Sequence, residues 1–307
     1  MAYLALQCTM DLAESSTAPF TEQSWVTDPG AHAALLAGLP VDLGGLCRSI
    51  ESLMVHYAGG DTEVPPARLG EIDTRRVEAM LTRIVELDGR PLTIPRPLSS
   101  RLIGCCRDYA VLLCSVLRQR GIPARVRFGF ATYFDPSFHS DHVVTEYWNG
   151  EQERWLLVDA EMDAGFPGEQ GLDFDPLDLP RDRFLVAGEA WQRCRRGDLD
   201  PNRCGVNDEI CGWGFVGRYV ALDHAALART EMLCWDGWGM ADIPPDGRWN
   251  ETEEALLDRV AVLSVAGHSE SFGTAPHLPP PRDVRSYSAA GFYEFALPLG
   301  ADNKSTS

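Results

Sequence analysis

Basic residues are scarce in this 307-residue sequence, in which 27 lysines and arginines stand against 45 aspartates and glutamates. The formal net charge is −18. Proteins that hold nucleic acid or anionic lipid by charge present clustered Lys and Arg side chains to the phosphates. An acidic excess of this size repels polyanions, so we expect neither nucleic acid nor a membrane as a partner.

Long apolar runs are also absent from the sequence. No stretch approaches the roughly 18 uninterrupted apolar residues that a membrane helix needs. The first residues, MAYLALQCTMDLAESS, lack the basic segment and the small-residue cleavage site of a secretory signal. We therefore expect a soluble, cytoplasmic protein whose nine cysteines, an odd number, stay reduced.

Hydrophobic periodicity gives the organisation of the chain, because no internal repeat or low-complexity tract divides it. Apolar residues at helical spacing predict helices over residues 46–57, 73–87, 105–119, 181–196 and 218–233. A further helix is expected after Asn250, because Glu253 completes a capping signature. Alternating apolar residues predict strands over residues 124–134, 142–148 and 154–159.

This order of helices, antiparallel strands and helices is typical of an α+β fold rather than of βαβ units. We expect four parts, which are a helical N-terminal part of the fold, a core that holds the strands, a helical C-terminal extension and a flexible tail rich in proline and small polar residues. Their predicted boundaries are residues 1–98, 99–180, 181–275 and 276–307.

Cys105 and Cys106 occupy the predicted first turn of the helix over residues 105–119. The exposed N–H groups and the macrodipole at a helix start favour a thiolate there. The same N–H groups are suited to hold the oxyanion of a tetrahedral intermediate. Such a cysteine needs a histidine to move the proton and a carboxylate or amide to orient that histidine.

The predicted hairpin supplies both groups by its register. If residues 149–152 form a four-residue loop, Trp148 pairs with Glu153, and counting outward places His142 opposite Asp159. Cross-strand neighbours have Cβ atoms about 5 Å apart on one face of the sheet. We therefore expect the Asp159 carboxylate to bind the His142 imidazole.

Three segments together resemble the transglutaminase-like superfamily. They are GCCRDYAVLLCSVLRQRGIPARVRFGF from Gly104, HVVTEYW from His142 and RWLLVDAE from Arg154, which match the family's cysteine, histidine and aspartate segments in order and spacing. The resemblance covers about residues 100–162. It implies a papain-like α+β core in which a catalytic helix packs on an antiparallel sheet, with Cys106 as nucleophile, His142 as general base and acid, and Asp159 as the orienting carboxylate.

Other interpretations of these residues remain open. Cys105 is expected to be a neighbour of the nucleophile or a second redox thiol, and both adjacent cysteines are also compatible with buried small hydrophobic residues. Asp108 is expected to be a first-turn helix acid. Glu146 is either structural or borders the site, and Trp155 is expected in the core.

Metal and cofactor sites are not expected. The His139 and His142 spacing, with Glu146 nearby, lacks the helix geometry that brings two histidines to one face of a zinc site. Three further cysteines have spacings unlike the close pairs of zinc sites, and we expect them to be scattered structural thiols: Cys194, Cys204 and Cys211.

Acidic residues gather after the predicted aspartate strand. Eight of them fall between residues 159 and 182, against one arginine. Such a run is usually a solvated loop. The alternative is that it attracts a cationic substrate, such as an amine acceptor. Trp235, Trp238, Glu231 and Asp236 either line a cleft or, in the case of the tryptophans, close the core.

The expected function is a cysteine enzyme that cleaves or transfers an acyl group through a thioester at Cys106. Water as the acceptor would make it an amidase or peptidase, and an amine would make it a transamidase or amide synthase. The alternative is a catalytically silent member that uses the same cleft as a binding or scaffold module. The substrates and the oligomeric state do not follow from the sequence.

Overall fold

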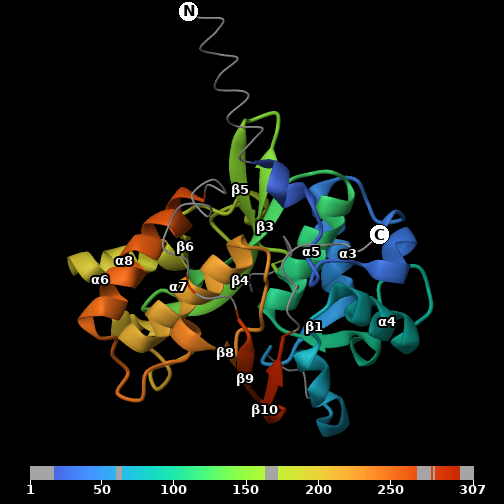
Figure 1. Ribbon diagram of the computed structural model, residues 1–307. Helices are drawn as coiled ribbons and strands as arrows, with labels where there is room; N and C mark the ends of the chain where they lie inside the picture. The colour runs from blue at the N-terminus through green and yellow to red at the C-terminus, as the bar shows by residue number, and fades with distance from the viewer. Residues whose placement is uncertain (1–16, 60–63, 163–171, 268–277, 279–280, 298–307) are drawn as a thin grey trace, which may run out of the picture.

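The computed structural model describes residues 17–59, 64–162, 172–267, 278 and 281–297 (Figure 1). Its centre is a five-stranded sheet with the strand order β5-β4-β3-β6, in which β7 pairs in parallel with β4. Helices α3, α4 and α5 lie on one side of this sheet in Figure 1, and α6, α7 and α8 lie on the other. The strands are β3 (Ala124–Asp135), β4 (Phe138–Asn149), β5 (Arg154–Val158), β6 (Phe184–Val186) and β7 (Cys204–Gly205).

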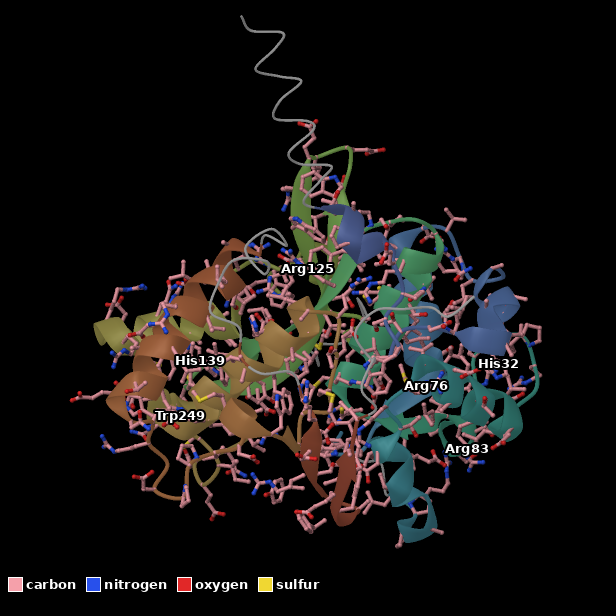
Figure 2. All side chains as sticks on the ribbon, in the orientation of Figure 1. His32, Arg76, Arg83, Arg125, His139 and Trp249 are labelled. Carbon is pink, nitrogen blue, oxygen red and sulfur yellow. The ribbon has the colours of Figure 1, made fainter. Side chains whose placement is uncertain are left out.

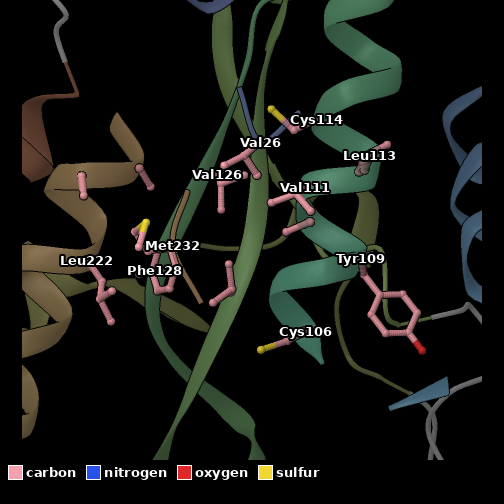
Figure 3. Packing of buried hydrophobic residues seen from close by; sticks show 14 of the residues in the cluster. Val26, Cys106, Tyr109, Val111, Leu113, Cys114, Val126, Phe128, Leu222 and Met232 are labelled. Atoms are coloured by element: carbon pink, nitrogen blue, oxygen red, sulfur yellow. The ribbon is translucent and has the colours of Figure 1, made fainter. Parts of the chain in front are cut away.

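Helix α5 (Cys106–Gln119) is the buried helix expected from the sequence, and it is buried almost all round. It begins after Cys105 and is followed by Gly121, whose φ of +72° is a conformation that glycine adopts without steric cost. Val111 on α5 and Val126 and Phe128 on β3 belong to one hydrophobic cluster (Figure 3). The helix is therefore fixed against the sheet that carries the hairpin.

The N-terminal part contains less α-helix than the periodicity predicts. The predicted helix over residues 46–57 ends at Leu53, and Met54–His56 forms strand β1, which pairs in parallel with β2. The predicted helix over 73–87 starts only at Val77. The elements here are η1 (Ala18–Thr21), η2 (Gly30–His32), α2 (Ala33–Leu36), α3 (Leu43–Leu53), β1 (Met54–His56), η3 (Pro66–Asp73), α4 (Val77–Leu87), η4 (Leu98–Ser100) and β2 (Leu102–Gly104).

The helices of the C-terminal extension are shifted relative to the prediction. Residues 184–186 pair with β3 as an edge strand, so α6 begins only at Ala187. Gly197, with φ +80°, caps the C-terminal end of α6. The capping box of Asn250 and Glu253 is confirmed. The elements are η5 (Pro176–Asp178), α6 (Ala187–Arg196), η6 (Pro201–Arg203), α7 (Trp213–Leu227), β8 (Asp236–Gly237), η7 (Gly239–Ala241) and α8 (Glu251–Ala266).

The prediction of a flexible tail over residues 276–307 is wrong for its middle. Strands β9 (Asp283–Ser288) and β10 (Gly291–Ala296) form a hairpin, and β9 pairs with β8. Val284 and Ser286 are buried at alternate positions, which is the period of a strand with one covered face. The expected loose residues at 298–307 lie outside the described residues.

Arg75 joins this C-terminal hairpin to the N-terminal part. Its guanidinium forms an ion pair with Asp236 at 2.6 Å, donates to the Tyr293 hydroxyl at 2.8 Å and lies 4.2 Å from the centre of the Phe295 ring. A buried ion pair with further hydrogen bonds fixes both elements. Among the described residues, no helix is long and apolar enough to cross a membrane.

Candidate active site

The start of α5 presents Cys105 and Cys106 in a defined geometry. Cys105 is the N-cap, with extended φ and ψ of −132° and 178°, and Cys106 is the first helical residue. Asp108 accepts a hydrogen bond from the Cys105 N–H at 2.9 Å and forms an ion pair with Arg107 at 3.0 Å. Its role as a first-turn helix acid is therefore confirmed. A Cβ at Gly104 would lie 2.8 Å from the Asp108 carboxylate, so this turn requires glycine.

The hairpin brings His142 and Asp159 together, although its register differs from the prediction. Trp148 pairs with Trp155 rather than with Glu153, a shift of two residues. A shift of two keeps every side chain on its own face, whereas a shift of one would reverse all of them. Asp159 therefore still lies on the face of His142, one step along the diagonal, and its Oδ2 is 2.8 Å from His142 Nε2.

Aromatic rings surround this His142–Asp159 pair. The Tyr133 hydroxyl donates to the same Asp159 Oδ2 at 2.6 Å. The rings of Tyr133, Phe134 and Phe184 lie with their centroids 6.1, 5.1 and 6.4 Å from that of the imidazole. His142 and Asp159 are 3% and 1% exposed, so water screens their interaction little.

Each member of the pair shifts the pKa of the other. Burial alone would lower the pKa of His142, but the Asp159 carboxylate more than offsets this effect, so the pKa lies above its usual value. Burial alone would raise the pKa of Asp159, but His142 and the hydrogen bond from Tyr133 bring it below its usual value. The arrangement thus favours an ionised Asp159 that stabilises a protonated His142, which is what a general acid and base requires.

Two residues that the sequence interpretation missed link the pair to the start of α5. His56 pairs with Gly104 in the β1–β2 ladder, and burial followed by the charge of His142 lowers its pKa to about 4. Glu161 donates its N–H to Asp159 Oδ1 at 3.1 Å, and burial chiefly raises the pKa of its side chain to about 8. The charges of both His142 and Cys105 act on the Glu161 carboxyl, so Glu161 lies within electrostatic range of both strand β4 and the start of α5.

The Cys106 thiol belongs to a cluster that no sequence pattern predicted. The sulfurs of Cys105, Cys106 and Cys234 lie within 4.8 Å of one another, and we call these three residues the thiol cluster. Figure 3 shows the Cys106 sulfur on the sheet side of the first turn of α5. Within the described residues, the Cys106 sulfur lies beside the other two sulfurs, and no hydrogen bond links it to His142.

Proximity within the thiol cluster shifts the acidity toward Cys234. The neighbouring Cys105 and Cys106 thiols lower the pKa of Cys234 to about 5. The neighbouring Cys105 and Cys234 thiols, together with burial, raise the pKa of Cys106. These shifts oppose the effect of the helix start on the Cys106 thiol.

The remaining residues that the sequence singled out have structural partners. Glu146 binds Arg125 at 2.7 Å and Arg127 at 2.6 Å, so its role is structural. Arg125 is labelled in Figure 2. Trp155 is half-buried, and the Arg125 guanidinium lies 3.9 Å from the centre of its ring. His139 lies three positions before His142 on β4, so the two imidazoles point to opposite faces of the sheet.

The tryptophan-rich segment is likewise held by contacts with the rest of the protein. Glu231 forms a buried ion pair with Arg118 at 3.0 Å, and Asp236 pairs with Arg75. Trp235 donates its indole N–H to Asp73 at 2.9 Å. Trp238 is 6% exposed and belongs to the core cluster, so it closes the core.

Most of the acidic side chains that the structure describes in the 159–182 segment have a hydrogen-bond or ion-pair partner. Asp173 pairs with Arg183, Asp178 pairs with Arg154, and Asp175 caps η5 by accepting from the Leu177 N–H. Asp163 and Glu169 lie outside the described residues. Much of the local charge is therefore balanced within the fold.

Comparison with known proteins identifies the segment that holds this geometry. Residues 87–160 match the family model of the transglutaminase-like superfamily. This segment is similar to the core of the transglutaminase-like superfamily. It contains Cys106, His142 and Asp159, and the predicted α+β fold class is confirmed.

One solved structure shows a partial similarity to this chain. It is named "Putative Cysteine Protease from Cytophaga hutchinsonii" and is 17% identical, with a TM-score of 0.30. The match covers 48% of this chain and 42% of that one, so the chain spans well under half of the matched protein. No curated protein matches the sequence.

Proposed function

We propose that this protein is a cysteine enzyme that transfers or hydrolyses an acyl group, with Cys106 as nucleophile, His142 as general base and acid, and Asp159 as the residue that orients His142. The observation that carries the proposal is the buried 2.8 Å contact between His142 and Asp159 in a core that also presents Cys106 at a helix start. A histidine whose pKa is raised by a buried carboxylate beside a helix-start cysteine is the arrangement that acid–base chemistry requires.

The reaction would begin with the loss of a proton from Cys106. Since Nε2 of His142 faces Asp159, Nδ1 is the ring nitrogen that would accept it. The Cys106 thiol would have to turn from the thiol cluster toward His142. Its thiolate would then attack the carbonyl carbon, and N–H groups of the first turn of α5, including that of Cys106, would hold the oxyanion.

Collapse of the tetrahedral intermediate would leave a thioester. The protonated His142 would give its proton to the leaving group, and the ionised Asp159 would stabilise the imidazolium until then. Water or an amine would next attack the thioester, with His142 accepting the proton of the attacking group. The product would be an acid in the first case and a new amide in the second.

An amine acceptor that is protonated, and therefore cationic, in solution is supported by the net charge of −18. Besides Asp159, the charges of Glu161 and Asp141 act on His142, and Asp182 is an exposed acid of the 159–182 segment. The test is to compare the KM of a cationic amine with that of a neutral amine in the wild type and in Asp182→Asn at low salt. Equal KM values for the two amines would contradict a cationic acceptor.

The thioester can be tested without knowledge of the natural substrate. We expect p-nitrophenyl acetate to acetylate Cys106 and hydroxylamine to release the acetyl group as a hydroxamate. Cys106→Ala should form none, whereas Cys114→Ala, which removes a buried thiol elsewhere on α5, should behave like the wild type. Equal hydroxamate formation by the two variants would contradict Cys106 as the nucleophile.

The alternative of a catalytically silent binding module is favoured by one observation, the position of the Cys106 sulfur beside two other sulfurs, with no hydrogen bond to His142 in the part of the chain that the structure describes. Iodoacetamide labelling separates the two functions. An activated Cys106 should react faster near neutral pH than the more exposed Cys211, and His142→Ala should remove the difference. If Cys106 reacts more slowly than Cys211 at every pH, the silent module is the better description.

A further inference from the structure

The thiol cluster has the composition of a site for a thiophilic cation. Cys105 and Cys106 come from the start of α5, and Cys234 comes from the segment between α7 and β8. All three sulfurs already lie within 4.8 Å of one another. In a tetrahedral site with metal–sulfur distances near 2.3 Å, two sulfurs lie about 3.8 Å apart. Three thiolates would therefore reach one ion with shifts of about 1 Å or less.

We propose that Cys105, Cys106 and Cys234 form a three-thiolate site for Zn²⁺ or a similar thiophilic divalent cation, with the fourth position open to water. No sequence pattern indicates this site, because Cys234 lies far along the chain from the two adjacent cysteines. The metal site itself does not depend on the proposed acyl transfer. The effect of the metal on activity rests on the proposed function, because Cys106 would be both a metal ligand and the nucleophile.

Positive groups near the thiol cluster suit the charge of such a site. Three thiolates and one divalent cation carry a net charge of −1. The start of α5 supplies a partial positive charge, and Arg107 lies within electrostatic range of Cys105. The buried Arg218 donates hydrogen bonds to the backbone carbonyl of Cys234 and, at 3.1 Å, to that of Asp236. These contacts also hold the Cys234 backbone in place.

Cys234 is the most exposed residue of the thiol cluster. Cys105 and Cys106 are 2% and 7% exposed, whereas Cys234 is half-buried. An incoming ion would meet Cys234 first and would displace the protons that remain on the thiols. Once bound, it would occupy the electron pair with which Cys106 attacks a carbonyl, so the ion would act as a reversible inhibitor of the proposed enzyme.

Cadmium is the probe for the site, because its thiolate bonds give an ultraviolet charge-transfer band. The reduced wild-type protein should bind one equivalent of Cd²⁺ with this band, and Zn²⁺ should displace it. Cys234→Ser should bind at least on the order of 100-fold more weakly, because even the loss of an outer-shell partner costs about 10- to 100-fold. Cys114→Ser, a buried cysteine of α5 outside the thiol cluster, is the matched control and should bind like the wild type.

A second variant guards against misfolding, since Cys105→Ser should show the same loss as Cys234→Ser while circular dichroism reports an intact fold. Equal Cd²⁺ affinity in the cluster variants and in Cys114→Ser would overturn the site. None of these measurements uses acyl transfer, so the metal site and the proposed function can fail separately.

Protection of Cys106 completes the test. Zn²⁺ should slow iodoacetamide labelling of Cys106 in the wild type but not in Cys234→Ser, and a chelator should restore it. If a thiol reductant restores labelling and a chelator does not, Cys106 has formed a disulfide with one of the other two cysteines instead, and the metal site is wrong.

Discussion

Strand β4 carries two buried charge clusters four positions apart, and they differ in kind. At His142, one titratable ring meets one carboxylate, and Tyr133 completes the group. At Glu146, the carboxylate meets Arg125 and Arg127 in what we call the arginine network. The first cluster holds a group that titrates near neutral pH, whereas the second holds groups that stay ionised throughout.

The pKa shifts express this difference. Burial alone would raise the pKa of Glu146, but the arginines bring it far below its usual value, so its charge is fixed. Asp223 supports the network by binding Arg127 through two contacts of 3.0 Å and by accepting the Phe128 N–H at 2.9 Å. A cluster with fixed and fully paired charges stabilises the fold, whereas a cluster with one mobile proton can carry chemistry.

The strongest test of this comparison is His142→Ala. It should lower the rate of acetylation by p-nitrophenyl acetate about 10³- to 10⁴-fold, because general acid and base catalysis contributes up to that much. His139→Ala is the control, since His139 lies on the same strand with its ring on the opposite face, and it should retain the wild-type rate. If the two variants lose activity equally, the assignment of His142 is wrong.

Glu146→Gln should have its main effect on stability rather than on chemistry. It leaves Arg125 buried without a carboxylate partner, whereas Arg127 keeps Asp223, and the uncompensated charge should lower the free energy of unfolding by about 3 to 5 kcal/mol. The acetylation rate per folded molecule should stay unchanged. Urea denaturation measures the first quantity, with exposed Glu151→Gln as the control. A large loss of rate in folded Glu146→Gln would contradict the separation of the two clusters.

The sequence was sufficient for the parts of the site that local patterns determine. The helix start at Cys106 follows from capping and apolar periodicity. The His142–Asp159 contact follows from the predicted hairpin, because its actual pairing is shifted by two residues and a shift of two keeps each side chain on the predicted face. Glu146 could not be assigned from the sequence because its partners on β3 become visible only with the register of β3 and β4.

Long-range pairings were beyond the sequence patterns. Strand β1 was predicted as helix because its three residues continue an amphipathic run, and only the pairing with β2 makes them a strand. The C-terminal hairpin was missed because nearby prolines suggested a tail, whereas its partner β8 lies far away in the chain. Cys234 likewise reaches the start of α5 only through the folding together of distant segments. Tertiary contacts therefore determine strand β1, the C-terminal hairpin and the position of Cys234.

Tyr133→Phe should sharpen the description of the pair with a smaller effect. It removes the hydroxyl that donates to Asp159 at 2.6 Å, and a hydrogen bond to a charged group contributes about 1.5 to 3 kcal/mol. We expect the acetylation rate to fall about tenfold and the pKa of Asp159 to rise, because its ionised form loses a donor. The acid limb of the pH–rate profile should move to higher pH. Exposed Tyr287→Phe should leave both the rate and the profile unchanged.

The smallest expected effect is on the pH dependence of stability. Because Asp159 raises the pKa of folded His142 above its unfolded value, the stabilisation from the protonated ring is fully present below the unfolded pKa of about 6.5 and is lost as the pH rises through the folded pKa. In Asp159→Asn only burial remains, which lowers the pKa of His142 and reverses the sign of its contribution.

The free energy of unfolding of the wild type minus that of Asp159→Asn should therefore decrease as the pH rises above the unfolded histidine pKa of about 6.5, as urea denaturation would show. Taking the difference removes the contribution of His56, whose lowered pKa acts in both proteins. Exposed Asp178→Asn should give a constant difference over this range. Parallel curves for the wild type and Asp159→Asn would mean that His142 does not titrate against Asp159, and the two clusters of β4 would then both be structural.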